Sequence, residues 1–341
     1  MKNKRRVQRK SINQNHYFVI MAVTIMFLIV SVILSFCLGA ASLSPAELFQ
    51  AIKAGPGSGA AGRIFWYVRL PRTLATVLAG AALAVSGTVI QNVLTNKLAS
   101  PSIIGVNAGA GLAVTICCAA GAVSGWMIAG SAFAGALIAV LLVTFTARKV
   151  GASRTTVILA GVAINSFLNA ASEAITTLVP EAGVQSADFR VGGFSSVAYT
   201  RLIPAGALII IGLLAAVSLC NELDLMALGE ETAQGLGLSV KKMRTVFLGI
   251  AALLAGAAVS FSGLLGFVGL IVPHLGRRLV GAECGKLIPF CIVFGAGFVT
   301  ICDLIARTMF APYEISVGIL MSFIGGPFFI FMLLKRKGER L

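Results

Sequence analysis

Residues 98–147 read LASPSIIGVNAGAGLAVTICCAAGAVSGWMIAGSAFAGALIAVLLVTFTA, fifty consecutive residues without an Asp, Glu, Lys or Arg. A helix crosses a bilayer with about 20 apolar residues, so this stretch is long enough for two crossings. The segment GAVSG at residues 121–125 provides a turn between them, since clustered glycine and serine interrupt a helix. The stretch therefore predicts a helical hairpin inside a membrane.

The whole chain of 341 residues has the same bias, with 58% hydrophobic and only 11% charged residues. A soluble globular domain carries about 25% charged residues, so a soluble enzyme is excluded. Disorder requires low hydrophobicity and is excluded too. The uncharged runs are continuous, whereas the strands of an outer-membrane barrel alternate. The composition predicts an all-α integral membrane protein, with residues 1–341 forming a single polytopic transmembrane domain.

Other uncharged runs predict further spans, and one of them is ambiguous. Residues 245–276 form a run of 32 residues, which is long for one span and short for two. The total is therefore nine or ten. The remaining runs are residues 18–40, 73–96, 155–179 (interrupted only by Glu173), 202–221, 287–302 and 315–334.

The distribution of basic residues decides between nine and ten spans, because Lys and Arg collect on the cytoplasmic side of membrane proteins. With ten spans and a cytoplasmic N-terminus, 20 basic residues lie inside and 7 outside. Treating residues 245–276 as one span gives 14 against 13. We therefore predict ten helices with both termini cytoplasmic, a basic cytoplasmic tail over residues 1–16, and a short eighth helix at about residues 268–279. Topology explains the net charge of +15, and no nucleic-acid partner is expected.

The N-terminus has features of a signal peptide, namely a basic start, an apolar run and the small residues GAAS at 39–42. Signal-peptide cores are about 7–15 residues long, whereas this apolar run exceeds 20. We expect an uncleaved first helix in a bacterial cytoplasmic membrane.

Two segments of the chain are similar to each other. Residues 78–87 (LAGAALAVSG) and 254–263 (LAGAAVSFSG) agree at seven of ten positions. They lie five spans apart, so they cross the membrane in opposite directions. This indicates an inverted repeat relating helices 2–5 to helices 7–10, an arrangement that flanks the pathway in transporters. Coincidence in a chain rich in Ala and Gly is the alternative.

The sequence lacks the common motifs of catalytic, metal-binding and nucleotide-binding sites. The two histidines form no HExxH motif, no GxSxG elbow occurs, and seven dispersed cysteines read as small apolar residues. GSGAAG at residues 57–62 follows no strand and is predicted to be a flexible loop, and GAECGK at residues 281–286 lacks the spacing of a P-loop. We expect no catalytic residue, no metal site and no cofactor bound by this chain.

Energy for active transport would therefore come from a partner or an ion. Ion coupling normally places paired ionisable residues near the bilayer centre. Glu173 is the one such residue here, with Asp303 near a helix end. A structural role for Glu173, bonded to a neighbouring helix or facing a watery cavity, and a functional role both stay open.

The predicted cytoplasmic segment 222–244 begins ELDLMALGEETAQGLG, with apolar residues at helical spacing and glycines as breaks. A short helical segment of this kind suits docking into a soluble partner. The alternative is an amphipathic loop resting on the membrane surface. Four acids among its first ten residues argue against contact with anionic lipid.

Five groups of motifs follow one another along the chain. They are RLPR (69–72) with residues 78–87 and Gln91, LASP (98–101) with Gly105 and GAG (109–111), LGEETA (228–233) with Leu236 and Gly237, GFVGLIVPH (266–274) with Arg277 or Arg278, and SVG (316–318) with IGGPFF (324–329). Together they resemble the iron-siderophore/cobalamin permease family of ABC importers. Asn92, residues 95–97 (TNK) and Gly326 depart from the usual family pattern.

The resemblance implies a homodimer or heterodimer in membrane lipid with a central pathway, two cytoplasmic ATPase subunits that use ATP, and an external substrate-binding protein. We expect a permease subunit, not an enzyme, of an ATP-driven importer for a ferric siderophore. Cobalamin and haem are alternative cargoes. An ion-coupled secondary carrier is the alternative from another class, and a membrane-embedded enzyme is a third.

The resemblance also implies roles for particular residues. Arg69, Arg72 and Arg307, predicted at external helix ends, would pair with glutamates of the binding protein, whereas ordinary snorkelling to the membrane surface is the alternative. The residues expected to couple to the ATPase are Leu228, Gly229, Glu231, Ala233, Leu236 and Gly237. The candidate pathway residues are Gln91, Ser153, Asn165 and Glu173.

Overall fold

The computed structural model describes residues 14–39, 45–57, 59–151, 153–311 and 313–338, and over these residues it contains helices and no strand. The all-α prediction is confirmed. Each of the ten predicted spans coincides with a helix. They are α1 (Gln14–Cys37), α4 (Leu70–Val93), α5 (Val106–Ala119), α6 (Gly125–Lys149), α7 (Arg154–Leu178), α9 (Tyr199–Ser218), α12 (Val240–Ser262), α13 (Val268–Leu279), α14 (Cys284–Thr308) and α15 (Val317–Gly338).

Seven helical stretches in the described part of the chain are long and apolar enough to cross a membrane. They comprise α1, α6, α7, α9, α12, α14 and the continuous stretch Gly59–Val93 that contains α4. The helices α5 and α15 are shorter apolar helices, and α13 has only 12 residues. The total of ten crossings therefore stays a prediction.

The ambiguous run 245–276 is divided between α12 and α13, and α13 begins and ends at the residues that the charge distribution predicted. The break lies between two residues with positive φ, Gly263 at 68° and Phe267 at 65°. Glycine adopts this conformation at no steric cost, which explains why α12 ends at Ser262.

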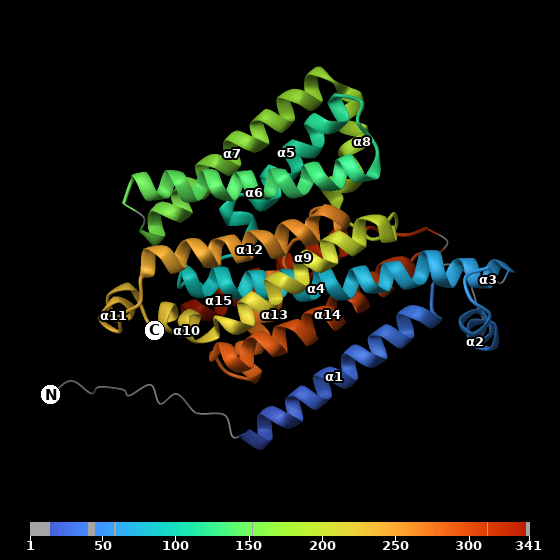
Figure 1. The fold of residues 1–341 in the computed structure, drawn as a ribbon, viewed down its shortest axis with the longest axis horizontal. Coiled ribbons are helices and arrows are strands. Elements are labelled where there is room, and N and C mark those ends of the chain that lie inside the picture. Colours follow the sequence, from blue (N-terminus) through green and yellow to red (C-terminus); the bar gives the residue numbers. More distant parts are fainter. Residues whose placement is uncertain (1–13, 40–44, 58, 152, 312, 339–341) are drawn as a thin grey trace.

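The central helix of the fold is α4, which packs against α9, α12, α13 and α14 (Figure 1). Glycines bring the backbones together: a Cβ at Gly80 would overlap the carbonyl of Gly295, and one at Gly87 would overlap that of Gly269. Such close approach is typical of helix pairs in membranes, where packing replaces the hydrophobic effect.

The two similar segments, residues 78–87 and 254–263, lie on α4 and α12. These helices pack side by side and run in opposite directions (Figure 1). The Ser86 hydroxyl donates a hydrogen bond to the Ala251 carbonyl at 2.7 Å. This geometry agrees with the predicted reversal of direction, while the full relation of helices 2–5 to helices 7–10 stays a prediction.

Helices α5, α6, α7 and α8 (Pro180–Val191) form a second group beside α12 (Figure 1). Gly109 on α5 and Gly135 on α6 meet backbone to backbone. The 3₁₀ turn η2 (Pro101–Ile104) leads into α5 through Gly105 at φ 97°. The predicted hairpin 98–147 is thus α5 and α6, joined near Gly121 at φ 73°.

Several short helices escaped prediction. They are α2 (Pro45–Ala54), α3 (Gly59–Ile64), the π-helical turn η1 (Phe65–Arg69) and α8. The flexible loop predicted over residues 57–62 is wrong from Gly59 onward, because α3 continues through η1 into α4. Trp66 ties this entry to α2 by donating a hydrogen bond to the Ala51 carbonyl at 3.2 Å.

The start of α1, the end of α15, and the short helices α10 (Cys220–Ala227) and α11 (Glu230–Gly235) all lie at one end of the molecule, here named the α11 end (Figure 1). Helices α2 and α3 lie at the opposite end, the α3 end (Figure 1). This arrangement agrees with termini on one side of the membrane. Which end faces the cytoplasm stays a prediction, and residues 1–13 of the predicted basic tail lie outside the described residues.

Candidate docking and transport surfaces

The predicted coupling segment forms α10, a turn and α11. Gly229 has φ 116° and ψ 156°, and Gly237 has φ 87°, so both turns use conformations that favour glycine. The side chains of Leu228 and Leu236 are exposed by 47% and 59%. Glu231 is exposed as well. The segment therefore presents two apolar side chains that the other described residues leave uncovered.

Ala233 does not belong to that exposed set, because its side chain is completely buried. The Leu238 amide donates to the Ala233 carbonyl at 3.0 Å, which folds α11 back toward α12. An ion pair of 2.9 Å between Glu230 and Arg244 holds the same junction. The prediction that Ala233 fills a groove on the ATPase is thus wrong: this residue stabilises the segment from within.

The middle of α10 is fixed to the start of α14 by Asp224, whose two carboxylate oxygens accept hydrogen bonds from the Cys284 amide at 3.0 and 3.1 Å. An acid at this position satisfies a backbone N–H at a helix start and complements the helix dipole. Burial, reinforced by Asp224 and Glu222, raises the pKa of Cys220 to about 11. The thiol is therefore protonated, in agreement with the reading of the cysteines as apolar residues.

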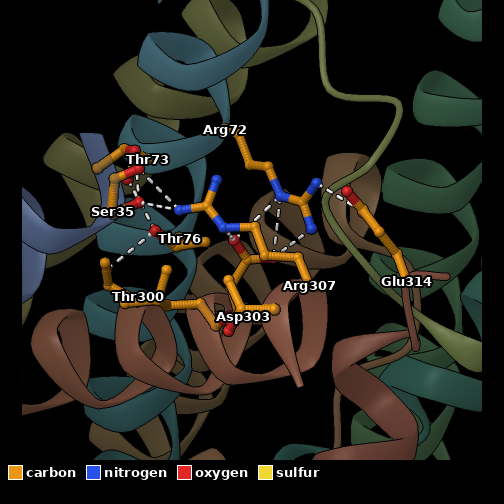
Figure 2. Close-up of polar contacts among 10 residues, drawn as sticks. Ser35, Arg72, Thr73, Thr76, Thr300, Asp303, Arg307 and Glu314 are labelled. Carbon is orange, nitrogen blue, oxygen red and sulfur yellow. Dashed lines mark hydrogen bonds and ion pairs between the residues drawn. The ribbon is translucent and has the colours of Figure 1, made fainter. Parts of the chain in front are cut away.

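Arg69, Arg72 and Arg307 are buried, with exposed fractions of 2%, 7% and 3%, and are not the exposed arginines that the sequence predicted. Figure 2 shows Arg72 between Asp303 and Glu314. Its Nε and Nη2 donate to Asp303 at 2.9–3.1 Å, and its Nη1 donates to Glu314 at 2.8 Å. A buried charge is tolerated only when it is paired in this way.

The other two arginines bind to the end of α1. Arg307 donates from Nη2 to the Ser35 carbonyl at 2.8 Å and to the Ser35 hydroxyl at 2.7 Å (Figure 2). Arg69 donates to the carbonyls of Phe36 and Cys37. The three guanidinium groups thereby join α1, α4 and α14 at the α3 end. Sequence reasoning missed this because the acceptors lie far away in the chain.

A cavity of about 190 Å³ lies beside this network. It is lined by Gly39, Ile64, Val68, Arg69, Arg72, Arg307 and Glu314. Glu314 is the partly exposed member of the two acids, with 33% of its side chain accessible, whereas Asp303 is fully buried. A docking role for the arginines stays a prediction.

Gln91 lies inside the subunit, with 2% exposed. Its amide donates to the Gly269 carbonyl at 3.0 Å, and its amide oxygen accepts from Arg277, which also donates to Asn92 at 3.1 Å. These bonds join α4 to α13. The prediction that Gln91 lines a pathway is therefore wrong, because the residue is buried inside the subunit.

Ser153 and Asn165 have structural contacts on α7. The Ser153 hydroxyl caps the helix by accepting from the Thr156 amide at 3.1 Å. The half-buried Asn165 donates to the carbonyls of Ser102 and Ile103 at 2.8 and 3.2 Å, which ties α7 to η2. Neither contact prevents the residue from bordering a pathway, so that role stays a prediction.

Glu173 belongs to a polar face on α7 that no other described part of the chain covers. Within the described residues, no hydrogen bond or ion pair joins its carboxylate to another side chain. Residues spaced by three or four positions lie on one side of a helix. The polar face, defined by its exposed members, is Ser166, Asn169, Glu173 and Thr177. The exposed residues Leu159 and Val162 continue the same side of α7 as an apolar surface.

The sequence matches the FecCD transport family over residues 27–335. This chain belongs to the FecCD transport family. It is an ABC-type permease and an integral, multi-spanning protein of the cell membrane.

Three similar proteins illustrate the relationship. The iron(3+)-hydroxamate import system permease protein of Bacillus subtilis (strain 168) is 34% identical, over 94% of this chain and 98% of its own. The hemin transport system permease protein of Yersinia pestis is 36% identical, over 92% and 95%. A solved metal-chelate type ABC transporter in an inward-facing conformation has a TM-score of 0.84 at 28% identity, covering 93% of this chain and 99% of that one.

Proposed function

We propose that this FecCD permease is a subunit of an ATP-driven importer for a ferric siderophore. Two permease subunits would enclose the pathway, two ATPase subunits would bind at the α11 end, and an external binding protein would dock at the α3 end. The observation that carries the transport role is the uncovered polar face of α7. The similarity to an iron-hydroxamate permease over nearly the full length of both chains supports the cargo.

A polar face on a membrane helix needs a polar environment. Ionisable residues that face lipid are costly, so they normally face a water-filled cavity or another helix. Helix α1 makes the contrast: its exposed residues are mostly large and apolar, such as Phe18, Met26 and Ile33, and suit contact with lipid. We infer that the polar face, with Glu173 near its centre, borders the pathway between two subunits.

The orientation with the α11 end in the cytoplasm is supported by charge. Arg148, Lys149 and Arg154 lie at the connection between α6 and α7, and Lys241 and Lys242 lie at the start of α12. All of these positions are at the α11 end (Figure 1). An excess of basic residues in short loops marks the cytoplasmic side, and the same orientation places ten spans between cytoplasmic termini.

Coupling to an ATPase is proposed for the α10–α11 segment. Leu228 and Leu236 would insert into the partner, while Gly229 and Gly237 hold the turns and Ala233 keeps α11 in place. Replacing Leu236 with Asp should place a charge in that contact. We expect ATPase binding in pull-down assays to fall at least tenfold, with membrane insertion unchanged.

Val150→Asp is the matched control, because Val150 is 70% exposed and directly follows α6. The end of α6 lies at the α11 end of the molecule (Figure 1). This variant should retain full ATPase binding. Equal losses in both variants, or no loss in Leu236→Asp, would contradict the assignment.

Docking of the binding protein is proposed at the cavity beside Arg69, Arg72 and Arg307. A carboxylate of the partner could approach these guanidinium groups on the side of Glu314. Arginine favours such contacts because its planar group binds a carboxylate with two parallel hydrogen bonds. Charge reversal of Arg72 is no test of docking, since it would set a third carboxylate beside Asp303 and Glu314 and disrupt the fold.

The decisive experiment reconstitutes the permease, its ATPase and its binding protein in proteoliposomes and measures uptake of a ferric hydroxamate siderophore, haem and cobalamin. We expect ATP-dependent uptake of the siderophore. Uptake of haem or cobalamin without uptake of the siderophore would show that the proposed siderophore cargo is wrong. Uptake without the ATPase would favour the ion-coupled carrier.

The polar face is tested in the same assay. Asn169→Leu combined with Glu173→Leu makes the centre of the face apolar, and we expect uptake to fall at least tenfold at equal protein level. Glu181→Gln on α8, which removes an exposed acid elsewhere, is the control and should transport normally. Normal uptake by the double variant would place the polar face outside the pathway.

A further inference from the structure

An apolar groove of about 420 Å³ lies along the outer face of α6 and ends beside Thr245 of α12. Its apolar lining consists of Ile138, Leu141, Leu142 and Phe145. These four side chains are exposed by 45–66%, so no other described part of the chain covers them. Both helices are candidate membrane spans, and the groove therefore faces the hydrocarbon region.

The groove leads to a narrow basic pocket at the α11 end, which encloses only about 10 Å³. Thr144, Arg148 and Thr245 line both, and the pocket adds Lys241 and Arg244. Arg148 donates to the Thr245 hydroxyl at 2.5 Å, which holds its guanidinium group at the junction. A neighbouring cation, Lys149, lies over the ring of Phe145 at 4.8 Å from the ring centre.

The basic pocket has more positive than negative charge. Arg154 at the start of α7 interacts electrostatically with Arg244 and Glu230. Its Nη1 donates to Thr95, while its Nε and Nη2 are buried without a hydrogen-bond partner among the described residues. Glu230 is the one carboxylate near this pocket in the described interactions, and it is paired with Arg244. Among the residues that the structure describes, Arg148, Arg154 and Lys241 form no ion pair.

We propose that the groove and the pocket together form a binding site for an anionic phospholipid. One acyl chain lies along Leu141, Leu142 and Phe145, and the headgroup phosphate lies at the mouth of the pocket, beside the exposed side chains of Arg148 and Lys241. A soluble acidic protein would match the charge but not the apolar groove, and a zwitterionic lipid would match the groove but not the charge. Basic pockets between membrane helices on the cytoplasmic side bind anionic headgroups by this combination, and the inference rests on the orientation proposed above, with the α11 end in the cytoplasm.

The test uses the full-length protein in nanodiscs that contain equal amounts of dioleoyl-phosphatidylglycerol and dioleoyl-phosphatidylcholine. Native mass spectrometry after release counts the lipids that stay bound. The wild type is expected to retain phosphatidylglycerol at least tenfold over phosphatidylcholine. Arg148→Gln with Lys241→Gln should abolish most of this preference, because each basic residue near the headgroup contributes about a fivefold factor.

Two further variants separate a site from general attraction. Lys53→Gln with Arg63→Gln removes two exposed basic residues at the α3 end and should leave the preference unchanged. Leu142→Trp fills the groove while keeping every charge, and should reduce the number of retained phosphatidylglycerol molecules by one. The proposal is overturned if the wild type shows no preference, if Arg148→Gln with Lys241→Gln keeps it, or if the control pair loses it equally.

Discussion

Asp303 on α14 and Glu173 on α7 are both carboxylates within predicted membrane helices, yet the fold treats them in opposite ways. Asp303 is fully buried and bound by Arg72 through two nitrogens, with Arg307 3.7 Å away. Glu173 is exposed, and its carboxylate contacts no other described side chain. A buried pair is costly to break, whereas an uncovered charge adds little to the stability of one chain. This difference indicates that Asp303 stabilises the subunit, whereas Glu173 contacts the surroundings of the subunit.

The largest effect is expected from Asp303→Asn, which leaves Arg72 and Arg307 buried without their shared counter-charge. Removing one partner of a buried ion pair destabilises by about 3–5 kcal/mol. Denaturant unfolding of the purified protein in detergent measures this change. Glu283→Gln is the control, because Glu283 forms an exposed pair with Lys286 at 2.9 Å and should cost less than about 1 kcal/mol. Equal effects would remove the distinction between the two kinds of charge.

The next effect concerns the packing of α4, the helix that Asp303 helps to hold. Gly87→Ala would place a methyl group against the Gly269 carbonyl and push α13 away. Overpacking of this kind costs about 1–3 kcal/mol. Gly130→Ala on α6 meets open space and should stabilise by up to about 1 kcal/mol through helix propensity. Thermal unfolding of both variants should therefore shift in opposite directions.

A smaller effect is expected at Glu314, the accessible partner of Arg72. Glu314→Gln keeps the shape and leaves the Asp303 pair intact, and 33% of the Glu314 side chain is exposed to solvent. After screening, the loss of unfolding free energy should be about 1 kcal/mol or less. The same denaturant assay measures this change. A loss of unfolding free energy as large as that of Asp303→Asn would show that Glu314, like Asp303, is essential to the pairing of Arg72.

The smallest change in stability is expected for Glu173→Gln. Exposed substitutions away from structural contacts usually change the free energy of unfolding by less than about 0.5 kcal/mol. Uptake in proteoliposomes should nevertheless fall if Glu173 borders the pathway. A clear destabilisation of the variant would mean that Glu173 serves the fold as Asp303 does.

The positions of the helices were predictable from local properties. Each apolar run coincides with a helix of the structure. The charge distribution indicated that residues 245–276 form two helices, and these are α12 and α13. Gly229 and Gly237 were correctly identified as turns because only the preference of glycine for positive φ was needed. Helices α3 and α8 were missed, since their polarity and small residues are also typical of loops.

Burial and pairing needed the tertiary structure. Arg72 lies 231 positions before Asp303 and 242 before Glu314, so no local pattern indicates that they meet. The same holds for Gln91 and Gly269, which are 178 positions apart, and for Ala233, whose burial depends on the return of α11 toward α12.

The amino-acid sequence determined that this protein enters a membrane as a set of helices, because hydrophobic run length and charge asymmetry act on each segment independently of the others. Only the tertiary structure decided which polar groups are paired between helices and which stay uncovered. A buried guanidinium must find acceptors wherever packing brings them. That choice separates the network of Arg72 and Asp303 from the polar face of α7.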